Sequence, residues 1–107
     1  MTTTIIQNHS NFKLLDLAYD VHMAKIYTLV MWTHEHIKNN PGEFISTHEL
    51  YEYYRADLEE INPTSILTEL SFYKEIQEAL LANKIILAKA RQNGKRGFNG
   101  IKYHIII

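Results

Sequence analysis

The chain has 107 residues, 46% of them hydrophobic, and no cysteine. We therefore expect a single domain, and disulfide frameworks, thiolate catalysis and cysteine-based zinc sites are excluded. The net charge of −1 conceals an uneven distribution: all 12 acidic residues lie between Asp16 and Glu78, whereas residues 83–107 contain six basic residues and no acid. This split predicts one positive patch on the molecule, the charge pattern that attracts phosphate. No stretch is typical of a signal peptide or a membrane span, so we expect a cytoplasmic protein.

The N-terminal part is predicted to be helical after a short arm. Residues 1–10 are polar and aperiodic, which favours a flexible arm, with the domain covering residues 11–107. Ser10 is a candidate cap for a short helical turn, and Asp20 for a long helix that reaches about Asn39. This helix is apolar nearly all round, which is typical of a helix that is either fully buried or part of a subunit interface, and one small domain rarely buries both sides of its first helix. We therefore predict a homodimer whose interface includes Leu29, Met31 and Trp32.

The middle of the chain carries clear start and stop signals. Residues 39–42, Asn-Asn-Pro-Gly, are expected to end the first helix, and residues 43–45 to form a short strand. Ser46-Thr-His-Glu49 is a capping box that opens a second helix ending near Glu60. Asn62-Pro63 begins a third segment that reaches Asn83. Its apolar residues fall on two faces about 100° apart, which favours a break near Ser71.

The C-terminal part has the alternation of β-strands. Strands are expected over residues 84–91 and 101–107, joined by a glycine-rich basic loop over residues 92–100. The order is helix, short strand, helix, helix, strand, basic loop, strand. It predicts a mainly α fold with a small antiparallel β-hairpin, the arrangement of a winged helix-turn-helix.

Several segments also resemble one known family. Residues 17–30, 46–54 and 71–86, and the sequence Gly94-Lys-Arg-Gly-Phe-Asn-Gly100, are similar to the C-terminal winged-helix domain of archaeal origin-recognition (replication initiator) proteins. The resemblance implies a recognition helix in the major groove and a wing on the DNA backbone or minor groove. Two features depart from that family: the chain has no ATP-binding loop, and Asn83 stands where a glycine often closes the recognition helix.

The predicted DNA-binding residues form two groups. The exposed side of the third helical segment is expected to read base edges, and basic residues of the hairpin to hold phosphates. An aromatic residue at the loop tip is expected either to pack on a sugar or a groove wall of the DNA or to fold back onto the strands of its own domain. The residues are Ser71, Tyr73, Lys74 and Gln77 for the bases, Lys89, Arg91, Lys95 and Arg96 for the phosphates, and Phe98 at the tip.

The function that this pattern predicts is binding of double-stranded DNA, by a small regulator of transcription or replication of the kind that viruses and plasmids carry. The alternative is a protein-interaction module, favoured by Glu69, Glu75 and Glu78, which would repel phosphate. His34 and His36 lie two residues apart on a helix, point in different directions and are not expected to share a metal ion. No catalytic motif is present, so we expect no enzyme activity, no cofactor and no small-molecule substrate.

Overall fold

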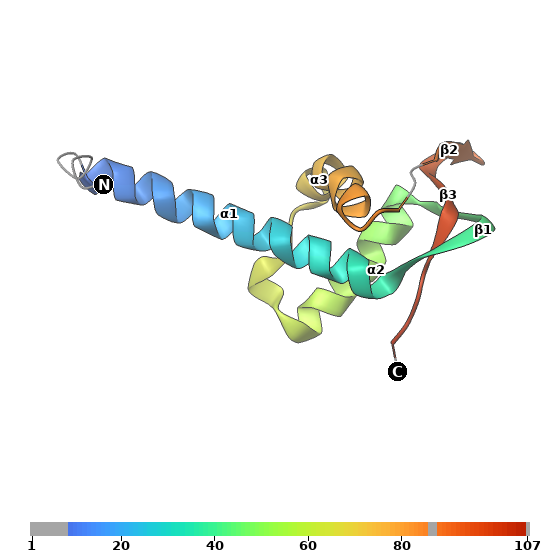
Figure 1. Ribbon diagram of the computed structural model, residues 1–107, viewed down its shortest axis with the longest axis horizontal. Coiled ribbons are helices and arrows are strands. Elements are labelled where there is room, and N and C mark those ends of the chain that lie inside the picture. Colours follow the sequence, from blue (N-terminus) through green and yellow to red (C-terminus); the bar gives the residue numbers. More distant parts are fainter. Residues whose placement is uncertain (1–8, 86–87, 107) are drawn as a thin grey trace.

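The structure is a computed structural model that describes residues 9–85 and 88–106, with side chains from Asp20 onward. It is mainly helical, with a small antiparallel sheet of strand order β1-β3-β2 (Figure 1). The predicted order of helices and strands is confirmed. No helix within the described part is long and apolar enough to cross a membrane. The elements are α1 (His9–His36), β1 (Ile37–Ser46), α2 (Thr47–Ile61), the 3-10 turn η2 (Pro63–Ser65), α3 (Glu69–Ala82), β2 (Lys89–Gln92) and β3 (Lys95–Tyr103).

Helix α1 is one continuous helix of 28 residues. The prediction that Asp20 caps the start of a new helix is wrong, because α1 continues through this residue. The Asp20 side chain is exposed to solvent and does not interrupt the helical backbone. The predicted end near Asn39 is also wrong. The helix ends at His36, whose carbonyl oxygen accepts a hydrogen bond of 2.6 Å from the backbone N–H of His104. Residues 1–8 of the expected arm lie outside the described residues, and the arm's last two residues begin α1.

Strand β1 contains the segment that was expected to stop the first helix. Its pairing with β3 shifts register between Asn39 and Phe44, so residues 40–43 form an irregular excursion within the strand. Gly42 has a φ of 91°, which glycine adopts without strain. The strand predicted over residues 43–45 is therefore the last part of a ten-residue strand.

Helices α2 and α3 begin at capping residues. The N-cap predicted at Ser46 is confirmed, since its hydroxyl accepts a hydrogen bond of 3.0 Å from the Glu49 N–H. Helix α3, however, is capped by Thr68 and not by Ser71, so the break lies at residues 66–68. The physical reason is Leu67, whose backbone N–H donates to the Tyr54 hydroxyl at 2.9 Å and whose side chain is buried.

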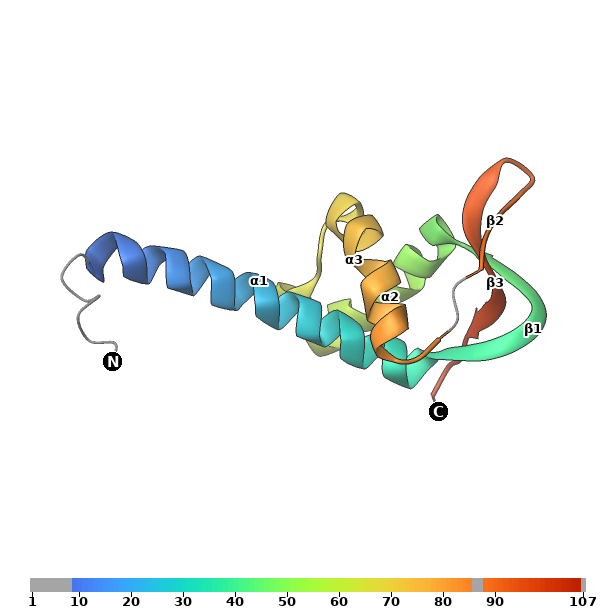
Figure 2. The same cartoon turned by 45° about the horizontal axis from the view of Figure 1, so that its top comes forward.

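The core lies where α3 packs across the C-terminal half of α1 (Figure 2). Leu29 and Trp32 belong to this core, so their assignment to a dimer interface is corrected; Met31, 41% exposed, stays outside it. Asn83, at the end of α3, forms hydrogen bonds to α1: its side-chain amide donates to the Val30 carbonyl at 3.0 Å and to the Thr33 hydroxyl at 2.6 Å. Packing against α3 therefore explains one apolar side of α1 without a second subunit.

The β2–β3 hairpin has a two-residue turn. Asn93 and Gly94 both have positive φ values, 51° and 76°, as a type I′ turn requires. The long loop expected over residues 92–100 is therefore wrong, because β3 already begins at Lys95. Of the strand expected over residues 84–91, residues 89–91 are in β2 and residues 86–87 lie outside the described residues. The strand expected to Ile107 ends at Tyr103.

Candidate nucleic-acid interface

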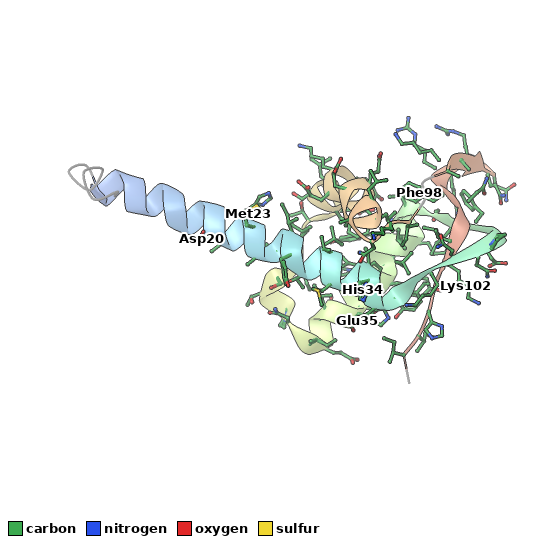
Figure 3. All side chains as sticks on the ribbon, in the orientation of Figure 1. Asp20, Met23, His34, Glu35, Phe98 and Lys102 are labelled. Atoms are coloured by element: carbon green, nitrogen blue, oxygen red, sulfur yellow. The ribbon has the colours of Figure 1, made fainter. Side chains whose placement is uncertain are left out.

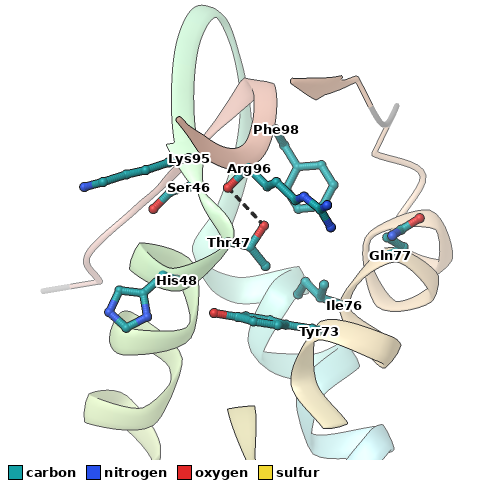
Figure 4. A pocket seen from close by; sticks show the side chains of 9 residues that line it. All are labelled: Ser46, Thr47, His48, Tyr73, Ile76, Gln77, Lys95, Arg96 and Phe98. Atoms are coloured by element: carbon teal, nitrogen blue, oxygen red, sulfur yellow. Dashed lines mark hydrogen bonds between the residues drawn. The ribbon is translucent and has the colours of Figure 1, made fainter. Parts of the chain in front are cut away.

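A groove of about 440 Å³ lies between the start of α2, helix α3 and the start of β3 (Figure 4). Three elements that are distant in sequence contribute to it, and its lining includes two cations; the Glu69 carboxylate is not part of the lining but contacts two lining residues, Tyr73 and His48. The residues that line it are Ser46, Thr47, His48, Tyr73, Ile76, Gln77, Lys95, Arg96 and Phe98.

The floor of the groove is apolar. Ile76 from α3 and Phe98 from β3 are both buried, and Phe98 is only 4% exposed. The expected loop-tip position of Phe98 is wrong, since it is the fourth residue of β3, but the alternative that its ring packs against the domain itself is confirmed. Phe98 can support a ligand from below but presents little surface to it.

Gly97 lets β3 approach the β1–α2 junction closely. A Cβ atom at this position would lie 2.1 Å from the Ile45 carbonyl oxygen and 2.7 Å from the Ser46 Cα, distances that no side chain tolerates. Next to it, the Thr47 hydroxyl donates to the Arg96 carbonyl at 3.3 Å. These contacts place Lys95 and Arg96 at the groove. Figure 4 shows Arg96 extending over the groove toward Gln77, and Lys95 extending away from α3.

The hairpin gathers four cations, all exposed: Lys89, Arg91, Lys95 and Arg96. Arg91 and Arg96 are direct cross-strand partners, an arrangement in which like charges destabilise the sheet. Arg91 donates to the Gly94 carbonyl at 3.2 Å, which ties its guanidinium to the turn. Among residues 20–85 and 88–106, none of the four forms an ion pair with a carboxylate.

The four predicted base-reading residues of α3 do not all face the groove. Tyr73 and Gln77 line it, whereas the exposed Lys74 and the half-buried Ser71 do not. The backbone N–H of Ser71 is used in capping, as a donor to the Thr68 hydroxyl at 3.2 Å. The structure therefore brings together two of the α3 residues with two of the hairpin cations.

One end of the groove carries a polar cluster that the sequence did not indicate. The Tyr73 hydroxyl donates a short hydrogen bond to the Glu69 carboxylate, which also lies 2.8 Å from His48 Nδ1. Burial and then this hydrogen bond raise the pKa of Tyr73 to about 12, so its hydroxyl keeps its proton at neutral pH. The same bonds, from Tyr73 and then His48, lower the pKa of Glu69. Hydrogen bonding to Tyr73 and His48 thus stabilises the ionised form of the Glu69 carboxylate.

The sequence did not indicate that two residues at the end of α3 help to position this helix. Asn83 orients α3 through its bonds to α1, and no local pattern distinguishes this contact from an ordinary helix cap. Lys84 has a φ of 61°, the left-handed conformation that glycine usually supplies after a helix. The backbone N–H of Ile85 donates to the Leu80 carbonyl at 3.0 Å and closes the helix end.

The two histidines considered as metal ligands have other contacts. His34 Nδ1 lies 3.1 Å from the Asn83 side-chain oxygen, and His36 Nδ1 lies 2.9 Å from the His104 carbonyl oxygen. In the part of the chain that the structure describes, no three histidine or carboxylate side chains converge as metal ligands would.

No protein-family model, curated protein sequence or solved structure matches this chain. The resemblance to archaeal origin-recognition proteins therefore stays a prediction made from the sequence.

Proposed function

We propose that the chain is a winged helix-turn-helix protein that binds double-stranded DNA. Helix α3 would enter the major groove, and the β2–β3 hairpin would lie against the phosphate backbone. A small regulator of transcription or replication, of the kind that viruses and plasmids carry, is the role in which we expect this activity.

The order of the elements supports the proposal. Helices α2 and α3 are joined by a short connection, and a two-stranded hairpin follows α3 directly. Strand β1 precedes α2 and completes a sheet of order β1-β3-β2. A helix-turn-helix with one wing would have this order of elements, with α3 as its second helix and the β2–β3 hairpin as its wing.

The observation that carries the proposal is the set of hairpin cations. Lys95 and Arg96 stand at a groove whose opposite wall is α3, and Arg91 adds its charge across the strand. Cations that repel one another and contact no carboxylate gain from an anionic ligand. A phosphate backbone provides regularly spaced anions, and α3 is then close enough to reach the bases.

Selection from a random duplex pool by the full chain tests this proposal. We expect retention on duplex DNA at about 50 mM salt, loss as salt rises, and enrichment of one sequence. Gln77→Ala and Lys74→Ala should change the enriched sequence if α3 reads bases, whereas Glu60→Ala on α2 should leave it unchanged. A chain that retains no duplex at about 50 mM salt would contradict the proposal.

One observation favours a protein-interaction module as a second candidate. Leu70 and Leu81 on α3 are 67% and 51% exposed, and Glu78 is exposed beside them. Exposed leucines with a carboxylate nearby suit a protein surface better than a phosphate backbone. The double variant Leu70→Ser/Leu81→Ser separates the candidates, because DNA binding through the hairpin should survive it.

A further inference from the structure

Helix α1 extends well beyond the rest of the molecule. Its 28 residues span about 42 Å at 1.5 Å per residue, and only the C-terminal half packs on other elements (Figure 1). The side chains of residues 20–24 are all exposed. An isolated helix of fewer than about 15 residues is marginal in water, so the projecting half lacks the packing that normally stabilises a helix.

An apolar seam begins in this half of α1 and continues into the C-terminal half. Val21, Ala24, Thr28 and Met31 follow one another at spacings of three, four and three residues, the a/d pattern of a coiled coil. Val21 is 56% exposed and Met31 is 41% exposed. By sequence spacing alone, the seam continues upstream through Leu14 and Leu17.

The seam is separate from the side of α1 that faces the core. At 100° per residue, it lies about 100° around the helix from Leu29 and Trp32, which are buried. The polar member of the seam, Thr28, already donates its hydroxyl to the Ala24 carbonyl at 2.9 Å. Its burial would therefore leave no unsatisfied hydroxyl donor. All four residues suit a dry helix–helix contact.

We infer that a second copy of this chain packs on this seam, forming a short parallel coiled coil. The flanking charges favour this occupant and this direction. Asp20 and Lys25 occupy the g and e positions, so in a parallel pair Asp20 faces the partner subunit's Lys25 on both sides of the seam. Neither residue forms an ion pair in its own chain, among the described residues. An antiparallel pair would not join these two charges.

This pairing replaces the predicted interface at Leu29, Met31 and Trp32 with one that retains only Met31. It also places the two globular parts at the same end of the coiled coil, because the helices run in parallel. The inference does not depend on DNA binding, since it uses a face of α1 remote from the groove.

Sedimentation equilibrium of the full chain, from about 1 to 100 µM, tests the seam. We expect a dimer, and we expect Val21→Asp to raise its dissociation constant at least tenfold, because a buried unpaired carboxylate is costly. Met23→Asp is the matched control: it is also exposed on α1 but lies off the seam, and it should change the constant less than about threefold. Circular dichroism checks that both variants fold.

A charge exchange tests the partner and the direction. Asp20→Lys and Lys25→Asp should each weaken the dimer, and the double variant should recover it, because opposite charges then face each other again. A parent chain that is monomeric at 100 µM would overturn the inference and leave the seam to a different helix. A dimer that survives Val21→Asp, or that the double variant does not restore, would overturn it as well.

Discussion

The two ends of strand β3 differ in how their polar side chains are used. At the C-terminal end, the Asp57 carboxylate accepts hydrogen bonds from Trp32 Nε1 at 2.9 Å and from the Tyr103 hydroxyl at 2.7 Å. The Tyr103 ring stacks on Tyr53, with centroids 4.0 Å apart. At the other end, Lys95 and Arg96 are exposed and contact no carboxylate among the described residues.

This difference distinguishes polar groups that stabilise the fold from those for which we propose a role in phosphate binding. The C-terminal end joins α1, α2 and β3 through partly buried groups that bind one another, which is what folding stability requires. The hairpin end places Arg91 opposite Arg96 beside the groove, an arrangement that costs stability, and neither Lys95 nor Arg96 forms an ion pair among the described residues. Lys102, on the same strand, lies well away from Phe98 and the groove (Figure 3). The position of a cation along β3 therefore decides its expected role.

The largest effect on stability is expected from Gly97→Ala. The added methyl would collide with the Ile45 carbonyl oxygen, a backbone atom that cannot move alone, so we expect a loss of about 3 kcal/mol or more. Urea unfolding measures it. Gly42→Ala is the control: nothing lies within 4 Å of its Cβ, and only its positive φ should cost about 1 kcal/mol. Equal losses in the two variants would refute the close approach of β3 to β1.

Asp57→Ala should destabilise the C-terminal end by about 2–3 kcal/mol, because it leaves Trp32 Nε1 and the Tyr103 hydroxyl without their acceptor. Thermal unfolding measures this loss, with the exposed Glu60→Ala as a control expected to change stability by less than about 0.5 kcal/mol. DNA affinity per folded molecule should not change. A large loss of affinity in the folded protein would show that the two ends of β3 are not independent.

A smaller effect of opposite sign is expected from Lys84→Gly. Glycine adopts the left-handed conformation at this position without the strain of a side chain, so unfolding should cost about 1 kcal/mol more. Denaturant unfolding checks this gain. Lys84→Ala, which removes the same charge but keeps a Cβ, should show no such gain; a gain of equal size in both would attribute the effect to charge.

Local signals predicted the order of the elements well. The capping pattern at Ser46 and Glu49 set the start of α2 correctly, because it depends on neighbours in sequence. The Asn93-Gly94 pair could have set the hairpin turn, since two positive φ values favour this dipeptide. The prediction of a long loop instead depended on also counting Gly97 and Gly100 as turn residues. Gly97 is required by contact with β1, which no local pattern reveals.

Tertiary contacts account for the remaining errors. For Phe98 the sequence left contact with a nucleic acid and packing on the domain equally open, and only the fold shows that its ring is buried in the core with Ile76. Trp32 was assigned to a dimer because α1 is apolar on several sides, and only the packing of the domain shows which side is internal. The cations of the hairpin were identified correctly as exposed, because an acid-free stretch is visible in the sequence itself.

Our central proposal is that Lys95 and Arg96 of the hairpin bind phosphate and that their side chains do not stabilise the fold. The measurement is DNA affinity as a function of salt for Lys95→Ala/Arg96→Ala, with Lys38→Ala/Lys102→Ala as the matched control. The control removes two cations that are also cross-strand partners, at the far end of the same sheet. We expect the hairpin variant to keep its stability within about 0.5 kcal/mol and to lose affinity for all duplexes, with a slope of log affinity against log salt smaller by about one to two units. The control should keep the slope of the parent. A hairpin variant with the affinity and slope of the parent would contradict the claim.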